Sequence, residues 1–181
     1  MRKVSTAMAV AFCVAFAARA QAPEKKPTPS PEQKRLGFFV GTWNQEGELK
    51  GGPAGAGGKV SGNETCEWFT GGFHVVCRSS GSGPMGSFKG LSFLTYSADD
   101  RSYYFQGIDS MGQADSGKGT LDGKTWTFSS EEKMGGKLIH SRYTMTETSP
   151  STYIAKWEMS EDGQNWISAM EMKATKAEAK K

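Results

Sequence analysis

The sequence predicts an all-β domain: an antiparallel up-and-down barrel of about 8–10 strands, preceded by one short helix. Three observations support this. Two-residue hairpin signals recur along the chain, apolar and polar residues alternate between them, and no helical periodicity follows Gly41. From Asp122 onward the turns lie about 13 or 14 residues apart, which leaves strands of about ten residues. Closure of such long strands into a barrel removes their exposed edges.

The N-terminal segment has the pattern of a secretory signal peptide. Arg2 and Lys3 precede an apolar run over residues 7–18, and Ala-Arg-Ala at 18–20 is a small-x-small cleavage pattern. We therefore expect residues 1–20 to be removed by cleavage near Ala20, and the mature protein to be periplasmic or secreted. The apolar run is too short to span a membrane, and no later run approaches that length.

Loss of the signal peptide balances the charge of the chain. The sequence has 22 Lys and Arg against 19 Asp and Glu; three basic and no acidic residues precede residue 21, so 19 of each sign remain. A balanced chain lacks the basic footprint of a nucleic-acid-binding protein, and we expect no such partner. Residues 21–33 contain four of the seven prolines and predict an extended linker. The barrel domain is expected over 34–176, and 177–181 form a charged tail.

The short helix has start and stop signals in the sequence. Ser30 is suited to cap it, Pro31 occupies the first helical position, and Gln33 completes a capping box. Leu36 and the apolar residues near it fall on one face, and the helix is expected to end at Gly41. The strands therefore begin immediately after a helix of two to three turns.

Pairing the strands about their turns gathers one set of residues on a single face. A turn at 135–136 places Phe128 opposite Tyr143, and a turn centred on Pro150 places Tyr143 opposite Trp157. A turn at 162–163 then places Trp157 opposite Ser168. This face is aromatic and methionine-rich, and a one-residue slip would invert it. With Gln45 from the first strand, the candidate ligand-binding residues of the interior are Gln45, Trp126, Phe128, Ser141, Tyr143, Trp157, Ser168 and Met170.

Cys66 and Cys77 lie at equal distances from the hairpin signal at 71–72, which sets them opposite each other. In an exported chain we expect a disulfide between them, with two buried thiols as the alternative. A two-residue loop would place them at a wide, hydrogen-bonded position. A four-residue loop would place them at a closer, non-hydrogen-bonded one.

The segment Gly41-Thr42-Trp43, directly after a short helix, resembles the start of calycin barrels, the lipocalins and fatty-acid-binding proteins. The resemblance implies that Trp43 packs under the barrel floor and that Gly41 lets the chain turn tightly past the indole. Further on, WFTGGFHVVC, GLSFLTYSADDRSYY and GIDSMGQADSGKGTLDGKTW are similar to a bacterial family, domain of unknown function 1579. That likeness runs from Leu36 to about Lys176. It implies a calycin-like barrel and no established activity.

These patterns favour a barrel that binds a small apolar ligand without catalysis. One alternative is a filled barrel whose exterior meets a partner. Another is haem binding, since residues 41–47 resemble the start of nitrobindin-like barrels. However, Gln45 replaces a glycine of that pattern. Those barrels hold their haem iron with a histidine near the C-terminal end, whereas no histidine follows His140 here, so we expect no cofactor.

The chemistry-bearing motifs of the chain are sparse. We find no G-x-S-x-G elbow, no C-x-x-C pair and no H-x-x-x-H, so neither an enzyme nor a metal site is predicted. An isomerase-like use of Tyr143 with a carboxylate is the remaining catalytic alternative. Asp109 and Asp115 are a candidate carboxylate pair, although we expect both in solvated loops, and residues 131–132 are expected at a charged strand end. Residues 63–65 form a glycosylation sequon.

Overall fold

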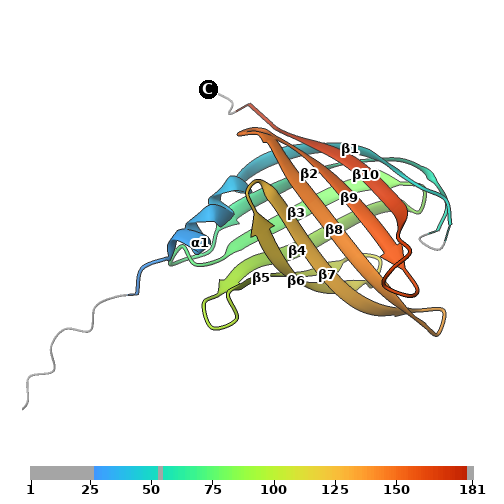
Figure 1. Cartoon of the computed structure of the whole chain (residues 1–181). Helices are drawn as coiled ribbons and strands as arrows, with labels where there is room; N and C mark the ends of the chain where they lie inside the picture. The colour runs from blue at the N-terminus through green and yellow to red at the C-terminus, as the bar shows by residue number, and fades with distance from the viewer. Residues whose placement is uncertain (1–26, 53–54, 179–181) are drawn as a thin grey trace, which may run out of the picture.

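The computed structural model describes residues 27–52 and 55–178. The predicted signal peptide and cleavage site lie outside these residues, as do the start of the linker and the last three residues of the tail. A short helix is followed by ten strands (Figure 1). The elements are α1 (Pro31–Arg35), the 3-10 turn η1 (Leu36–Phe38), β1 (Gly41–Leu49), β2 (Gly58–Trp68), β3 (Val75–Gly83), β4 (Gly86–Ser97), β5 (Ser102–Asp109), β6 (Ala114–Asp122), β7 (Thr125–Met134), β8 (Lys137–Ser149), β9 (Thr152–Ser160) and β10 (Ile167–Lys176).

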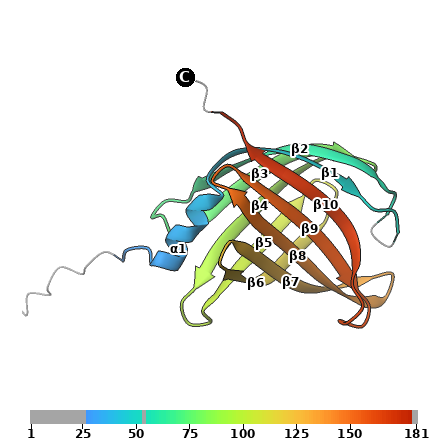
Figure 2. The same cartoon turned by 45° about the horizontal axis from the view of Figure 1, so that its top comes forward.

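The ten strands form one closed antiparallel barrel in sequence order. The strand β10 returns beside β1, from Trp43 opposite Lys176 to Leu49 opposite Met170, and this pairing closes the sheet (Figure 2). The predicted fold class is therefore confirmed, at the upper end of the expected strand number. Among the described residues, no helix is long and apolar enough to cross a membrane.

The helix α1 lies across one end of the barrel (Figure 1). Its N-terminus carries the predicted capping box. The Gln33 backbone N–H donates to the Ser30 hydroxyl at 3.2 Å, and the Ser30 backbone N–H donates to the Gln33 side-chain oxygen at 2.8 Å. The chain continues through η1, where Leu36 is fully buried, to Phe39. The apolar side chains that cover the floor of the barrel therefore come from η1 and Phe39, since no residue of α1 is buried.

Trp43 is the centre of this floor and is fully buried. Its indole N–H donates to the Phe39 carbonyl oxygen at 2.7 Å, and its ring meets the Tyr153 ring with centroids 5.0 Å apart. The Lys176 ammonium lies 4.9 Å from the indole centroid and donates to the Phe38 carbonyl oxygen at 3.1 Å. Gly41 has a φ of +128°, a conformation that favours glycine at this turn into β1.

A second tryptophan, Trp126, completes the floor from β7. Its indole N–H donates to the Glu147 carboxylate at 2.7 Å, and Arg35 of α1 forms a 2.7 Å salt bridge to the same oxygen. The Trp126 ring also packs against Phe39 and Tyr103, with centroids 5.0 and 4.9 Å apart. Because Glu147 satisfies one donor from the helix and one from the barrel, it fixes α1 onto the sheet.

The register confirms two of the three predicted pairings on the inner face. Phe128 lies opposite Tyr143, and Tyr143 lies opposite Trp157. The third is wrong: Trp157 lies opposite Met170, while Ser168 lies opposite Glu158. The predicted two-residue turn at 162–163 is a longer loop, and the register shifts between Ser168 and Met170. This bulge turns the Ser168 side chain out to solvent and removes it from the candidate site.

Candidate ligand-binding cavity

The described residues leave a cavity of about 720 Å³ inside the barrel, above the floor. This volume lies within the range of small-molecule sites, roughly 300–1,000 Å³. The lining reaches residues beside the β3–β4, β5–β6 and β7–β8 turns, at the end of the barrel away from α1. The barrel is therefore closed at its helical end and hollow above it, and the alternative of a completely filled interior is wrong.

Six of the eight predicted interior residues line the cavity. They are Gln45, Phe128, Ser141, Tyr143, Trp157 and Met170. Trp126 belongs to the floor beneath the cavity, where its indole is fully buried, and Ser168 lies outside the barrel. The lining also includes Leu94, Phe105 and Met172, so most of the wall is apolar.

One wall carries small residues and makes room for a ligand. The inner faces of β2–β5 contribute Gly62, Ser79, Gly90, Ser92 and Gly107 to the lining. Ser79 lies opposite Gly90, and Ser92 lies opposite Gly107, so the small residues are adjacent across strands. Large side chains line the cavity from both sides: Leu94 and Phe105 from β4 and β5, and Tyr143, Trp157 and Met170 from β8 to β10. The small residues leave room between these larger side chains.

A polar group of three side chains lies deep in the cavity. The Gln45 amide nitrogen donates to the Glu64 carboxyl oxygen at 3.3 Å and to the Tyr153 hydroxyl at 3.2 Å. These residues come from β1, β2 and β9, which closure of the barrel brings together. Both Gln45 N–H donors are thereby used, and its carbonyl oxygen remains as an acceptor.

Glu64 is a carboxyl group in an apolar cavity, and this environment shifts its pKa. Burial raises the pKa of Glu64 from 4.5 to about 7, although the hydrogen bond from Gln45 opposes the shift. Burial also raises the pKa of Tyr143 and of Tyr153, and the negative charge of Glu64 adds to both shifts. The tyrosines thus remain neutral near neutral pH, while Glu64 changes its charge there.

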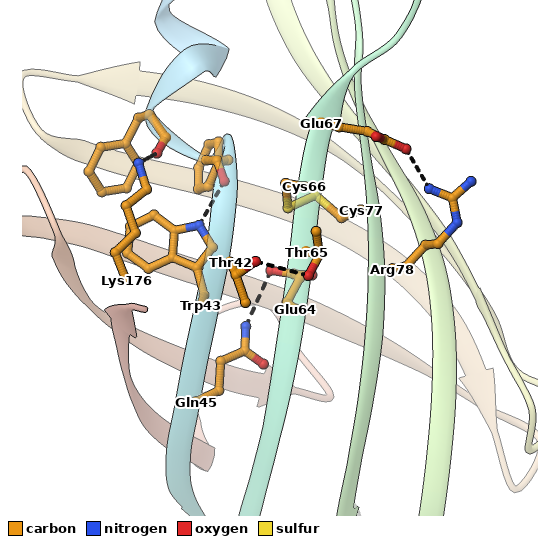
Figure 3. The surroundings of a disulfide bond; sticks show 12 residues. Thr42, Trp43, Gln45, Glu64, Thr65, Cys66, Glu67, Cys77, Arg78 and Lys176 are labelled. Atoms are coloured by element: carbon orange, nitrogen blue, oxygen red, sulfur yellow. Dashed lines mark hydrogen bonds and ion pairs between the residues drawn. A yellow bond between two sulfur atoms is a disulfide. The ribbon is translucent and has the colours of Figure 1, made fainter. Parts of the chain in front are cut away.

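The predicted disulfide between Cys66 and Cys77 is present beside Glu64. Figure 3 shows the bond joining β2 to β3, with the dashed Gln45–Glu64 hydrogen bond close by. The hairpin is closed by a backbone hydrogen bond from Phe69 to His74, so the loop holds four residues. Cys66 and Cys77 then fall at the closer kind of pair, and their Cα atoms are 4.0 Å apart.

Both sulfur atoms lie within 4.8 Å of a Glu64 carboxyl oxygen. The disulfide removes the two thiolates that a metal would need, so this group offers a single ligand, Glu64. Neither histidine of the chain lines the cavity. His140 pairs with Glu131 at 3.2 Å and His74 contacts the Thr95 hydroxyl at 2.7 Å, so no imidazole is placed to ligate a haem iron inside the barrel.

Further carboxylates lie toward the open end. The Trp157 indole N–H donates to the Ser141 hydroxyl at 2.9 Å, and Ser141 donates to Glu132 at 3.2 Å. Asp109 and Asp115 also line the cavity, and partial burial together with the Asp109 charge raises the pKa of Asp115. Asp109 ends β5 and Asp115 lies on β6, so both reach the cavity mouth. Asp115 is exposed, as expected, and the Asp109 carboxylate accepts from the backbone N–H groups of Met111 and Gln113 in the adjoining loop at 2.8 and 2.9 Å.

A known protein family matches most of this chain. Residues 28–176 match the family described as "Protein of unknown function (DUF1579)". The chain belongs to this family. No curated protein matches it in sequence.

Two solved structures share the fold of the DUF1579 barrel at low sequence identity. One is the S-type phycobiliprotein lyase CPES from Guillardia theta, with a TM-score of 0.59 and 10% identity, covering 82% of this chain and 94% of that one. The other is Rv2717c from M. tuberculosis, with a TM-score of 0.56 and 10% identity, covering 83% and 99%. At such identity the likeness concerns the fold alone.

Glu64 is a candidate functional residue of the DUF1579 barrel that the sequence patterns above do not single out. Glu64 was interpreted only as the middle of a glycosylation sequon. It lies two residues before Cys66 on β2, and alternate residues of a strand share a face. An inward disulfide therefore implies an inward Glu64, and this spacing is the signal that identifies it.

Proposed function

We propose that this DUF1579 protein is an exported barrel that binds a small, largely apolar molecule in its interior. The observation that carries the proposal is the cavity of about 720 Å³ with an aromatic and methionine wall. Apolar pockets with a few convergent polar groups are the usual form of small-molecule sites. Gln45, Tyr143 and Ser141 supply such groups among the residues selected from the sequence.

Export is supported by the disulfide, because such bonds persist in oxidising compartments. We assign no chemical step to the barrel. Glu64 and the neighbouring tyrosines are taken to orient a ligand, although a carboxyl of raised pKa beside hydroxyl groups is also a common feature of acid–base catalysts.

An interaction domain is the second candidate, and one observation favours it. Phe93 and Ile108 are 42% and 58% exposed, and they flank Leu91 on the outer face of β4 and β5. Such a patch suits a protein contact. The patch supports a function less strongly than the cavity does, because scattered exposed apolar residues are normal on soluble proteins.

The test is a titration with N-phenyl-1-naphthylamine, a neutral probe whose fluorescence rises in apolar surroundings. The wild-type barrel is expected to bind it with saturation. Ser79→Phe places a ring in the open part of the cavity, because Gly90 lies opposite, and should weaken binding by about tenfold or more. Ser80→Phe is the matched control, one residue away on the outer face. Equal binding by both variants would contradict an interior site.

A further inference from the structure

We propose that the ligand of this barrel has an apolar body ending in a protonated amine, and that Glu64 is the residue that binds the amine. The inference rests on the proposed function and names the chemical class of its ligand. It is carried by the position of Glu64, by the absence of a cationic partner for it among the described residues, and by the charges along the cavity.

Glu64 has acceptor capacity that the described residues do not use. Gln45 donates the one hydrogen bond that they give to its carboxyl, at 3.3 Å. None of their salt bridges includes Glu64. A carboxylate offers roughly four lone-pair sites, so most of its capacity faces the cavity. An ammonium group, with its three donors, matches this arrangement.

The surroundings of Glu64 make a cationic ligand favourable. A buried carboxylate without a partner is unstable, and burial accordingly raises the pKa of Glu64 to about 7. A ligand ammonium would supply the missing opposite charge. A ligand carboxylate would instead bring a second negative charge into the same apolar space, where repulsion is strong. The site therefore discriminates against fatty acids.

The remaining charges of the cavity point the same way. Asp109, Asp115 and Glu132 line its outer part, while Lys133 is the one cation among the described lining residues, and its side chain is exposed. A mouth that carries mainly negative groups concentrates cations and repels anions. The apolar wall, including Phe105, then accepts the body of the ligand.

The pH dependence of amine binding follows from the groups around Glu64. Gln45 on β1 does not titrate, Tyr143 on β8 and Tyr153 on β9 have raised pKa values, and the cysteines of β2 and β3 are oxidised. Within pH 5–9, Glu64 is thus the group of this cluster whose charge changes. Binding of a cation releases its proton, so affinity rises with pH and levels off above about pH 7.

The experiment uses decylamine, decan-1-ol and decanoate, which share one alkyl chain and differ in headgroup. Each is titrated against the bound naphthylamine probe at about pH 8, where Glu64 is ionised. We expect decylamine to bind roughly tenfold or more tightly than decan-1-ol, and decanoate to bind most weakly. The amine affinity of the wild type should fall as the pH is lowered to about 5.

Two variants locate the effect. Glu64→Gln keeps the shape and removes the charge, so the amine should lose its advantage while decan-1-ol binds within about threefold of wild type. Glu67→Gln is the matched control on the same strand, since Glu67 is exposed and paired with Arg78 on the outer face. It should leave the amine preference unchanged.

Each outcome bears on the inference. Binding of decan-1-ol without any amine preference, or a preference that survives in Glu64→Gln, overturns the inference and leaves the proposed function standing. Binding of none of the three compounds or the probe overturns both. If Glu64→Gln fails to fold, the pH series of the wild type decides: an amine affinity that is flat between about pH 5 and 8 overturns the role of Glu64.

Discussion

The side-chain amide of Gln45 donates a 3.3 Å hydrogen bond to the Glu64 carboxyl across the first two strands of the barrel. This contact places a titratable group inside an otherwise apolar cavity and supports it with a neutral partner. A neutral donor compensates a buried carboxylate less than a cation does. The stability of the unliganded protein is therefore expected to depend on the ionisation of Glu64.

The first prediction concerns this pH dependence. The pKa of Glu64 is raised from 4.5 to about 7, so the folded state holds its proton where the unfolded chain has lost it. Stability from this group is complete below pH 4.5 and falls as the pH rises to about 7. Glu64→Gln should gain about 2–3 kcal/mol over wild type between about pH 4.5 and 8, measured by urea unfolding.

Glu67→Gln serves as its control, because Glu67 lies on the same strand in solvent. Its stability difference from wild type should not change over that pH range. If the Glu64→Gln difference is equally flat, the carboxyl is not buried as described.

The second prediction tests the floor of the barrel. Trp43 is fully buried and donates to the Phe39 carbonyl oxygen at 2.7 Å. Trp43→Ala should lower the free energy of unfolding by about 3–5 kcal/mol, because it leaves a large cavity. Trp43→Phe keeps most of the packing and should cost less. Equal costs for the two variants, measured by urea unfolding, would argue against the packing role of the indole.

The third prediction concerns the attachment of the helix. Glu147 accepts from both Arg35 and the Trp126 indole at 2.7 Å. Glu147→Ala leaves the indole donor unsatisfied and should cost about 2–3 kcal/mol in thermal or urea unfolding, while Glu147→Gln retains an acceptor and should cost less. Glu48→Ala, at an exposed surface pair with Lys50, is the control and should leave stability nearly unchanged.

The fourth prediction concerns Cys66 and Cys77, which are 11 residues apart in sequence. The double variant Cys66→Ala, Cys77→Ala should lose about 2–3 kcal/mol of stability, and reduced wild type should lose a similar amount. Unfolding of the oxidised, reduced and variant proteins measures this. Two titratable thiols in protein purified without reductant would show that the bond does not form.

The fold could be predicted from the sequence because its local signals agree. The capping box at Ser30 predicts the helix, and the hairpin signals with the alternating faces of β7–β9 predict the barrel. The capping box and the registers of β7–β8 and β8–β9 are as predicted. The cysteine pairing followed from symmetry about one turn. These features depend on residues close in sequence, which is why a single chain reveals them.

The errors arose where side chains or closure override local pattern. The Asp162 carboxylate accepts from the backbone N–H groups of Gln164 and Asn165 at 2.8 Å, which extends the expected turn into a loop. Together with the bulge that follows, the longer loop places the Ser168 side chain outside the barrel. Glu64 was missed because an inward carboxylate breaks the apolar pattern of an inner face. Its partners on β1 and β9 meet it only once the barrel closes.

The central claim is that the barrel holds a ligand, and native mass spectrometry tests it most directly. The mature protein would be purified from the export compartment of its own host and measured intact, then after denaturation. We predict an additional mass of a few hundred daltons that is lost on denaturation, on a polypeptide two hydrogens lighter than its reduced form. The mass of the polypeptide alone in every charge state, together with no binding of the naphthylamine probe, would contradict the claim.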